Sequence, residues 1–464
     1  MSRPLSVRLV NERALWSYPR TLIVGKGFDQ SSGVGITLTS LFRDWPKDGL
    51  AAVCAPSEAA DTTVCEIYYA LGSEEARWVW PISRFEQKVS SGPVLRRPAD
   101  GGVRRPAASV DDRGRHRGRT YAGLARQTAW AALVASGGEH FLRHLGASAR
   151  LAAWIRNFRP DVLYTHLESL PMIRFVDSLV AQFDLPLVIH MMDDWPLVPE
   201  HEGILSPLTR RVINRELRRL MDKASCNMAI SQYMCEAFEA RYGHAFLPFH
   251  NVLDTRAWIV APRTSWLASK PFRVVYTGRV GKANETALRD VAAVVALLAD
   301  KGLAINLEIY ALGREPFSPG ALPDSRAVRL LPAIDYADIP GLLVEADLLV
   351  LPLDFSQKAL EYARYSMPTK VAEYLGSGTP ILVYCPEDTA VGHYARNSGW
   401  GALVGTRDRD ALARTIVRLA SDEQERRRLG QIALSVAQAD HDPSRVREDF
   451  ARALSDASTA GSGR

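Results

Sequence analysis

The sequence predicts an α/β protein made of two doubly wound domains that face each other across a cleft. Short apolar runs alternate with helical patterns in two separate series, the first beginning at Leu22 and the second at Phe272. Such alternation is typical of parallel sheets covered by helices. The chain of 464 residues is too long for one hydrophobic core and suits two domains of ordinary size. Its hydrophobic content of 47% and charged content of 23% are those of a water-soluble globular protein.

Cysteine usage and the N-terminal sequence point to the cytoplasm. The five cysteines are odd in number and form no C-x-x-C pair, so we expect neither a disulfide framework nor a zinc site. The N-terminus has no apolar signal-peptide core, and no window reaches the length of a membrane span. We therefore expect a cytoplasmic protein, with peripheral contact at the inner face of a membrane as one option.

The first domain is predicted over residues 1–254 and opens with a strand, a glycine-rich loop and a helix. The strand covers Leu22–Val24, and the loop contains Gly25 and Gly27. The dinucleotide spacing G-x-G-x-x-G is absent, so we expect these glycines to serve close packing or to make room for a substrate. A second strand over Ala51–Cys54 and a helix over Asp61–Leu71 are expected to follow.

Residues 90–119 interrupt the first domain and carry eight arginines against three acidic residues. Hydrophobic periodicity disappears there, and we expect a mobile surface loop. The arginines could meet the phosphates of a membrane surface or of a lipid-diphosphate acceptor, and a solvated insertion without a partner is the alternative. No aromatic residues interleave with the arginines, so we do not expect nucleic acid as a partner.

Polar side chains follow two further apolar runs of the first domain. His166 and His190 each stand at the end of such a run, and Asp193 and Asp194 come shortly after His190. The carboxyl ends of parallel strands form the edge where ligands bind in open α/β sheets. These side chains are therefore candidates for catalysis, while a purely structural role is the alternative for each histidine.

Residues from Ser206 onward form a basic amphipathic helical pattern, with apolar side chains on one face and six cations on the other. We expect the apolar face to pack on the core, because strands are predicted on either side; binding to an anionic membrane is the alternative. Further strands are expected over Ser225–Ile230 and Phe246–Phe249. Residues 255–270 show no clear period and are predicted to be the linker between the domains.

The second domain is predicted over residues 271–440. Its first unit is a strand over Phe272–Tyr276, a loop, and a helix over Glu285–Asp300. The loop contains Gly278, Arg279 and Lys282, which place a flexible backbone and two cations directly after the strand. A diphosphate requires this combination, because arginine can bind it in a bidentate manner and lysine supplies a point charge.

A later stretch of the second domain offers another half of a phosphate site. Pro368 and Thr369 follow a predicted strand over residues 346–352 and are typical of the start of a helix. A helix start presents free amides and a positive dipole end, so Thr369 and Lys370 are candidates for phosphate binding. Glu373 lies one turn later, where its carboxylate could accept hydrogen bonds from a ribose diol. A solvated helix residue is the alternative for Glu373.

Three more helical patterns follow, over residues 408–420, 422–437 and 443–454. We assign residues 441–464 to a C-terminal helix and tail. The last seven residues are expected to fray.

Together these motifs resemble the retaining nucleotide-sugar glycosyltransferases of the GT-B fold, which is built from two Rossmann-like domains. The resemblance points to glycosyltransferase family 4. It rests on residues 276–282 (YTGRVGK), on residues 368–375 (PTKVAEYL) with residues 378–380, and on residues 251–254. The run from His190 to Pro196 is similar to those of polysaccharide-building members, and the resemblance covers the chain apart from residues 90–119.

The resemblance implies transfer of a sugar from a nucleotide-diphosphate sugar to an acceptor hydroxyl in polysaccharide or glycoconjugate synthesis. The first domain would bind a carbohydrate or lipid-linked acceptor, and the second would bind the nucleotide sugar. No metal or other cofactor is implied, because protein cations and helix dipoles hold the leaving diphosphate in this family. The implied donor contacts are Gly278, Arg279, Lys282, Thr369, Lys370 and Glu373. The implied catalytic residues, facing the sugar and acceptor, are His190, Asp193 and Asp194.

One position departs from the family pattern. The family has a second glutamate eight residues before the one that matches Glu373, and Tyr365 stands there; Glu361 is the nearest acidic residue upstream. Two other functions remain open from the sequence. One is a nucleotide-sugar epimerase of the same shape, and the other is a non-catalytic nucleotide-sugar-binding or regulatory protein.

Overall fold

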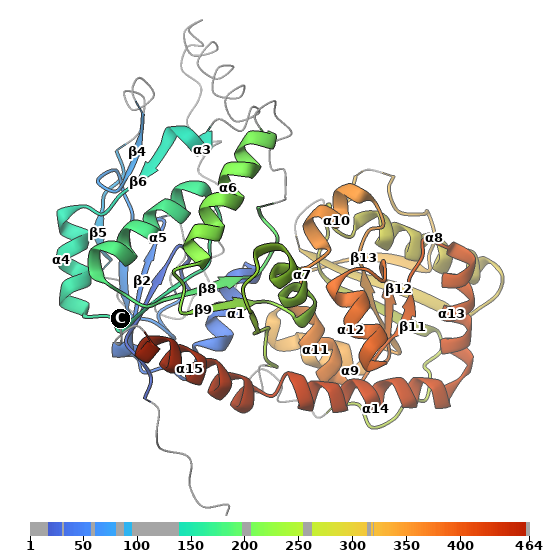
Figure 1. Cartoon of the computed structure of the whole chain (residues 1–464). Helices are drawn as coiled ribbons and strands as arrows, with labels where there is room; N and C mark the ends of the chain where they lie inside the picture. The colour runs from blue at the N-terminus through green and yellow to red at the C-terminus, as the bar shows by residue number, and fades with distance from the viewer. Residues whose placement is uncertain are drawn as a thin grey trace, which may run out of the picture.

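The computed structural model describes residues 17–29, 32–56, 61–79, 88–94, 139–196, 206–253, 262–312, 317–318 and 320–460. Figure 1 shows two α/β domains side by side, joined at their lower edge by the long red helices α14 and α15. Most of the predicted arginine-rich loop, residues 95–119, lies outside the described residues. Its first part does not behave as a loop, because Gly92–Pro93 forms strand β5, which pairs antiparallel with β3.

The first domain is built on one eight-stranded sheet in the order β10-β9-β8-β7-β1-β2-β3-β5. All its pairings are parallel except the one with β5. The central strands are buried on both faces, which explains why they appear in the sequence as continuous apolar runs. The remaining seven strands are β1 (Thr21–Val24), β2 (Leu50–Cys54), β3 (Ile67–Ala70), β7 (Val162–Thr165), β8 (Leu187–Met191), β9 (Cys226–Ala229) and β10 (Leu247–Pro248).

Serine side chains start most helices of the first domain. Each serine side chain accepts a hydrogen bond from an amide in the first turn of its helix, in the cases of Ser32, Ser148, Ser169 and Ser231. This hydrogen bond satisfies an N–H group that has no partner within the helix. The helices are α1 (Gly33–Leu41), α3 (Glu139–Leu142), α4 (Ala149–Phe158), α5 (Leu170–Phe183), α6 (Ser206–Met221) and α7 (Gln232–Tyr242). A short hairpin of β4 (Ala76–Trp78) and β6 (Arg143–Leu145) lies beside them.

The helix predicted over Asp61–Leu71 is wrong. Ile67–Ala70 is strand β3, and it pairs with β2 along its whole length. Tyr68 and Tyr69 are both buried, so the two aromatic side chains pack on opposite faces of the sheet. A run of one β-branched and two aromatic residues favours a strand, and this preference outweighs the helical spacing.

The second domain contains a six-stranded parallel sheet in the order β13-β12-β11-β14-β15-β16. Its strands are β11 (Phe272–Arg279), β12 (Ile305–Leu312), β13 (Val328–Pro332), β14 (Leu348–Pro352), β15 (Ile381–Tyr384) and β16 (Ala402–Val404). Its helices are α8 (Glu285–Asp300), α9 (Ile339–Glu345), α10 (Gln357–Ala363), α11 (Lys370–Ser377), α12 (Ala390–Ser398), α13 (Arg409–Ser421) and α14 (Glu423–Asp440). The predicted boundaries of α8 are confirmed at both ends.

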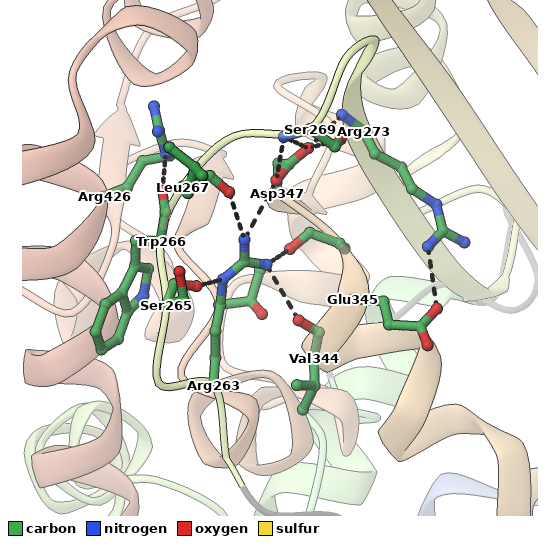
Figure 2. Close-up of polar contacts among 12 residues, drawn as sticks. Arg263, Ser265, Trp266, Leu267, Ser269, Arg273, Val344, Glu345, Asp347 and Arg426 are labelled. Carbon is green, nitrogen blue, oxygen red and sulfur yellow. Dashed lines mark hydrogen bonds and ion pairs between the residues drawn. The ribbon is translucent and has the colours of Figure 1, made fainter.

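The second half of the predicted linker is firmly attached to the second domain. Arg263 is 9% exposed and donates hydrogen bonds to the carbonyl oxygens of Ser265, Val344 and Ala346 and to Asp347 (Figure 2). Asp347 also accepts from the amides of Ser269 and Arg273. Residues 255–261, the first part of the predicted linker, lie outside the described residues.

Helix α15 (Pro443–Ala460) belongs to the core of the first domain, although it follows the whole second domain in the sequence. Phe450 is fully buried, with its ring centroid 5.0 Å from that of Phe42 and 5.2 Å from that of Phe249. Arg447 donates to the Ser40 carbonyl oxygen and forms an ion pair with Asp44. The chain therefore crosses between the domains twice.

Helix α6 packs its apolar face on the first domain, as predicted, with Ile213 and Leu217 buried. Leu208, predicted on the same face, is 53% exposed. None of the described helices is both long and apolar enough to cross a membrane.

Candidate active site

The end of β11 and the start of α11 are tied together, and this junction brings the predicted donor residues into one place. The ammonium group of Lys370 donates to the carbonyl oxygen of Thr277 at 2.7 Å and lies 4.1 Å from the ring centroid of Tyr276. The hydroxyl of Tyr374 accepts from the Thr277 amide at 3.1 Å. Burial lowers the pKa of the Lys370 side chain. An ammonium group has three N–H donors, so two remain for a ligand.

Gly278 is required at this junction for two reasons. Its φ of +117° lies in the region that residues with a side chain rarely adopt. A Cβ atom there would lie 2.9 Å from the ammonium nitrogen of Lys370. The glycine in the predicted phosphate loop thus allows the lysine to reach the end of β11.

β11 runs to Arg279, three residues further than the predicted strand, so Gly278 and Arg279 belong to the strand and not to the predicted loop. The side chains of Arg279 and of Lys282, three residues later, are both exposed. Within the described part of the chain, neither is engaged in an ion pair. The backbone between them is held in place, because the Tyr276 hydroxyl donates to the Arg279 carbonyl oxygen at 2.7 Å and the Asn284 side-chain amide donates to the same Tyr276 hydroxyl at 2.9 Å. Two cationic side chains therefore extend from a fixed loop.

Thr369 does not cap α11 as predicted. Its backbone is already helical, with φ −56° and ψ −33°, and its side chain makes no capping hydrogen bond. A capping residue needs extended backbone angles to turn its hydroxyl back to the first amides. Glu373 is half-buried on the first turn and accepts a hydrogen bond from the Tyr336 hydroxyl at 2.7 Å.

Asp354 is a residue that sequence reasoning missed. It is 4% exposed, and its carboxylate accepts from the amides of Thr286 and Ala287 in the first turn of α8. The amides at the start of α8 are thus occupied from within the protein. The only sequence signal was an aspartate two residues after a buried strand, and no spacing linked it to a helix start almost seventy residues earlier.

The prediction that His190 faces the sugar or acceptor is wrong. His190 lies inside β8, is 0% exposed, and has both ring nitrogens engaged. Nδ1 lies 2.6 Å from the Tyr164 hydroxyl, and Nε2 lies 3.1 Å from the Phe249 carbonyl oxygen. Burial, together with the neighbouring His166, lowers the pKa of His190 to about 3. A neutral histidine with no free nitrogen serves the fold rather than catalysis.

The prediction for Asp194 is also wrong. Asp194 is 3% exposed and forms a bidentate pair with Arg241 of α7, at 2.6 and 2.9 Å. Burial raises the pKa of Asp194, and the hydrogen bonds and charge of Arg241 oppose that shift. A carboxylate held in this way fixes α7 to the end of β8 and is not available to a substrate.

Asp193 differs from its neighbour. Its residue is half-buried, and its Oδ1 atom is buried with no hydrogen-bond partner among the described residues. His166, at the end of the adjacent strand β7, is in a similar state: Nδ1 lies 3.2 Å from the His190 carbonyl oxygen, and Nε2 has no hydrogen bond. Of the three predicted catalytic residues, Asp193 is the one whose carboxylate keeps an unused acceptor at the sheet edge.

Tyr365 stands at the position where the family pattern has its second glutamate. Its ring packs between the domains, 5.6 Å from the ring centroid of Tyr233 and 6.3 Å from that of Phe238. The guanidinium of Arg241 lies 5.8 Å from the same ring. A position that carries a carboxylate in the family pattern is thus part of an aromatic contact between α7 and the second domain.

Two family descriptions match the chain. Residues 110–252 match Glycosyltransferase Family 4, and residues 271–422 match Glycosyl transferases group 1. The first match contains Asp193, and the second contains all six predicted donor residues. No curated protein matches the sequence.

Several solved structures share the fold over almost the whole chain. Sucrose-phosphate synthase from Thermosynechococcus elongatus has a TM-score of 0.57 at 14% identity, covering 93% of this chain and 97% of its own. HepE from Anabaena has a TM-score of 0.56 at 15% identity, covering 94% and 99%. The α,α-trehalose 6-phosphate synthase from Burkholderia multivorans has a TM-score of 0.55 at 15% identity, covering 95% and 99%. Both domains thus match glycosyltransferase families within one shared fold, and the protein belongs to the glycosyltransferases of the GT-B fold, with a family 4 first domain and a group 1 second domain.

Proposed function

We propose that this glycosyltransferase moves a sugar from a nucleotide-diphosphate sugar to an acceptor hydroxyl, with retention of the anomeric configuration and without a metal ion, in polysaccharide or glycoconjugate synthesis. The observation that carries the proposal is the junction of β11 and α11. Lys370 lies beside Gly278 at this junction, Arg279 ends β11, Lys282 stands in the loop that follows, and Glu373 lies one turn into α11. Three cations and an open backbone suit a diphosphate.

The comparisons support the nature of the donor. The Anabaena HepE structures were determined with UDP and glucose and with UDP-glucose. Retention rests on the resemblance of residues 368–375 to retaining members of family 4. The proposal that no metal ion is needed rests on the cations Arg279, Lys282 and Lys370. They can neutralise the negative charge of the diphosphate, which a metal ion would otherwise do.

In the proposed reaction the bond between the sugar and the diphosphate breaks through an oxocarbenium-like state. Arg279 and Lys282 stabilise the negative charge that develops on the leaving phosphate. Lys370 donates its remaining N–H groups to the same phosphates. Glu373 accepts hydrogen bonds from the ribose hydroxyls. The acceptor hydroxyl attacks the face of the sugar from which the diphosphate leaves, and the hydroxyl proton passes to the leaving phosphate oxygen.

The test is the release of UDP from UDP-glucose and other UDP-sugars by the purified protein. A transferase releases free sugar slowly and transfers faster with an acceptor, an epimerase yields an isomeric nucleotide sugar, and a binding protein yields no product. Arg279→Ala should lower the rate at least about a hundredfold, the usual effect of losing one charge-stabilising donor. NMR of the product then reports its anomeric configuration, and added EDTA should leave the rate unchanged.

Arg326→Ala is the matched control. Arg326 is an exposed arginine of the same domain, but it precedes β13 and therefore stands at the amino edge of the sheet. Equal rates for the two variants would show that Arg279 has only a structural role, and this result would overturn the assigned diphosphate site.

A further inference from the structure

A pocket of about 420 Å³ lies at the amino edge of the first sheet. Its lining comes from two places in the chain, Arg20 directly before β1 and residues 156–159 at the end of α4. These segments meet because α4 leads into β7, and β7 is the parallel neighbour of β1. The volume is within the range of about 300–1,000 Å³ found for small-molecule sites. We call this feature the arginine pocket.

The arginine pocket lies away from the candidate active site. Asp193 and His166 follow the carboxyl ends of β8 and β7, whereas the pocket is at the start of β7 and β1. The four residues of β1 span about 13 Å, so the length of the strand separates the two edges. Figure 1 shows α4 on the side of the first domain turned away from the second domain. A ligand held there takes no part in the transfer itself.

Three arginines make the lining strongly positive. Arg20, Arg156 and Arg159 each carry a positive charge, and no aspartate or glutamate of the described residues lines the pocket. Asp161, the nearest acidic residue along the chain, accepts a hydrogen bond from the backbone amide of Arg20 at 2.7 Å. Among the described residues, none of the three guanidinium groups has a carboxylate as an ion-pair partner.

Capping of α4 uses little of this hydrogen-bonding capacity. Arg20 donates through Nε to the carbonyl oxygen of Phe158 at 2.9 Å, which satisfies one of the last carbonyl groups of the helix. A guanidinium has five N–H donors, and the described residues use only this one of Arg20. They accept no hydrogen bond from the guanidinium groups of Arg156 and Arg159. Stabilisation of the helix end therefore accounts for one contact, but not for three cations in one pocket.

Aromatic rings and backbone hydrogen bonds hold two of the arginines in place. The guanidinium carbon of Arg20 lies 4.6 Å from the ring centroid of Phe158, and that of Arg156 lies 5.8 Å from the ring centroid of Phe183. The amide of Asp161 joins the two segments by donating to the Arg20 carbonyl oxygen at 2.8 Å. Side chains that are fixed in this way lose less freedom when they bind a ligand.

Arg159 occupies a position where glycine is usual. Its φ of +52° places it in the left-handed region directly after α4. Helices commonly end on glycine there, because a side chain makes this conformation costly. Arginine therefore carries a backbone cost at this position, while its side chain supplies the third cation of the pocket. Arg159→Gly removes that cation and the backbone cost together.

The lining favours an anion that carries phosphate. A guanidinium presents a planar fork of N–H donors that matches two phosphate oxygens at once. Gathering cations without an acid is unfavourable, and a bound anion relieves their repulsion. Three arginines suit a group with more than one negative charge, which a phosphate monoester or a diphosphate has and a single carboxylate lacks. Asn157 adds an exposed amide donor beside them.

We infer that the arginine pocket binds a phosphate-bearing anion at a site separate from the donor site. The bound group is a phosphate monoester or a diphosphate. It belongs either to a dissolved phosphate compound or to the headgroup of a phospholipid, and both present the same chemistry to the arginines. The inference does not depend on the proposed transfer reaction.

The first test measures pyrophosphate binding to the full-length protein by calorimetry, with UDP present in excess to occupy the donor site. We expect Arg156→Gln and Arg159→Gly each to weaken binding at least about tenfold, because each loses charge-assisted hydrogen bonds to the anion. The melting temperature of Arg159→Gly should stay close to that of the unaltered protein, because glycine adopts the left-handed conformation without strain. Loss of affinity in this variant is then not loss of the fold.

Arg174→Gln is the matched control, because Arg174 is an exposed arginine of α5 in the same domain and lies outside the pocket lining. Equal pyrophosphate affinity in Arg156→Gln and Arg174→Gln would overturn the inference.

The second test identifies the source of the phosphate by sedimentation with phosphatidylcholine vesicles, prepared with and without phosphatidic acid, which ends in a phosphate monoester. Binding that requires phosphatidic acid and is lost in Arg156→Gln, but not in Arg174→Gln, assigns the pocket to a lipid headgroup. Pyrophosphate binding without vesicle binding assigns it to a dissolved phosphate compound. If the unaltered protein binds neither probe, the arginine pocket is not an anion site.

Discussion

Lys370 serves the fold and the donor site with one side chain. One N–H group of its ammonium holds the end of β11 through the Thr277 carbonyl oxygen, and the charge lies over the ring of Tyr276. The position of the ammonium is therefore set before a ligand arrives, and preorganised charge is worth more to a reaction than charge that must be moved into place. Arg279 and Lys282 complete the set from a loop that is itself hydrogen-bonded.

Glu373→Gln should weaken nucleotide binding. The carboxylate accepts from Tyr336 in the free protein, and a ribose diol would add hydrogen bonds to the charged group. Each such bond contributes roughly 1.5–3 kcal/mol, so the dissociation constant for UDP should rise by at least about tenfold in calorimetry. Glu361→Gln is the comparison, because Glu361 is the nearest upstream acid. A larger loss of affinity in Glu361→Gln would move the ribose contact to that residue.

His190 should make the stability of the first domain depend on pH. Its pKa of about 3 in the fold lies below the ordinary value of 6.5, so the unfolded chain binds a proton that the folded chain excludes. The contribution of neutral His190 to the free energy of unfolding is complete above pH 6.5. It is lost as the pH falls toward 3, by about 1.4 kcal/mol per pH unit.

Urea unfolding at pH 7.5, 6 and 5 measures this effect. His190→Met should be less stable at pH 7.5, because it loses two hydrogen bonds, but its free energy of unfolding should fall less steeply with pH. Parallel pH profiles for the two proteins would mean that His190 is protonated in the folded state.

At the scale of elements, the segment between the domains is divided into two parts. Residues 262–270 are part of the second domain, because Arg263, Asp347 and the ring of Trp266 fix them to α9, β14 and α11. Only residues 254–261 and the junction at His441 are left to connect the domains. The division could not be predicted from the sequence, since an extended segment without period looks the same whether its side chains are buried or free.

Asp347→Asn should destabilise the second domain. It removes the charge opposite a buried arginine, and breaking a buried pair on one side costs about 3–5 kcal/mol. Glu345→Gln is the matched control, because its carboxylate is 74% exposed and pairs with Arg273 near the surface (Figure 2). Exposed pairs contribute about 0–1 kcal/mol. Urea unfolding compares the two variants through the midpoint of the transition that belongs to the second domain. Equal midpoints would show that Arg263 is held by carbonyl oxygens alone.

Elements were predicted well where periodicity and local boundary residues agree. The predicted strand over residues 346–352 and all of α8 follow this rule. β3 breaks it, because a short aromatic run fits either pattern. The candidate site was predictable only in part. The spacing of Gly278, Arg279 and Lys282 at the end of the first strand indicates the cations in the sequence. The burial of His190, however, depends on Phe249, 59 residues away, and the pairing of Asp194 depends on Arg241, 47 residues away.

At the scale of the whole molecule, α15 completes the core of the first domain although it follows the second domain in the sequence. It supplies Phe450 to an aromatic cluster with Phe42, Trp45 and Tyr164, all in the first domain. The first domain is therefore discontinuous in sequence, with the second domain inserted between its two parts. A boundary drawn by chain position, such as a tail over residues 441–464, separates pieces that share one core.

Truncation after His441 should unfold the first domain while the second stays folded. Loss of α15 exposes the ring faces around Phe42 and removes a fully buried phenylalanine, and a buried Phe→Ala change alone costs about 3–5 kcal/mol. Truncation after Ala460 removes only residues outside the described range and is the control. Near-UV circular dichroism and limited proteolysis report the state of each domain. A truncated protein with an intact, protease-resistant first domain would contradict the assignment of α15.

The late position of α15 also sets an order for folding on the ribosome. Residues 443–460 emerge only after the entire second domain has been synthesised. Nascent chains usually fold their N-terminal domain first. Here the second domain, continuous from residue 262 to the end of α14, can close its core while the first still waits for its last helix. Throughout that interval the aromatic surface around Phe42 is uncovered, so this protein is most vulnerable to aggregation late in its synthesis, when most of the chain is already made.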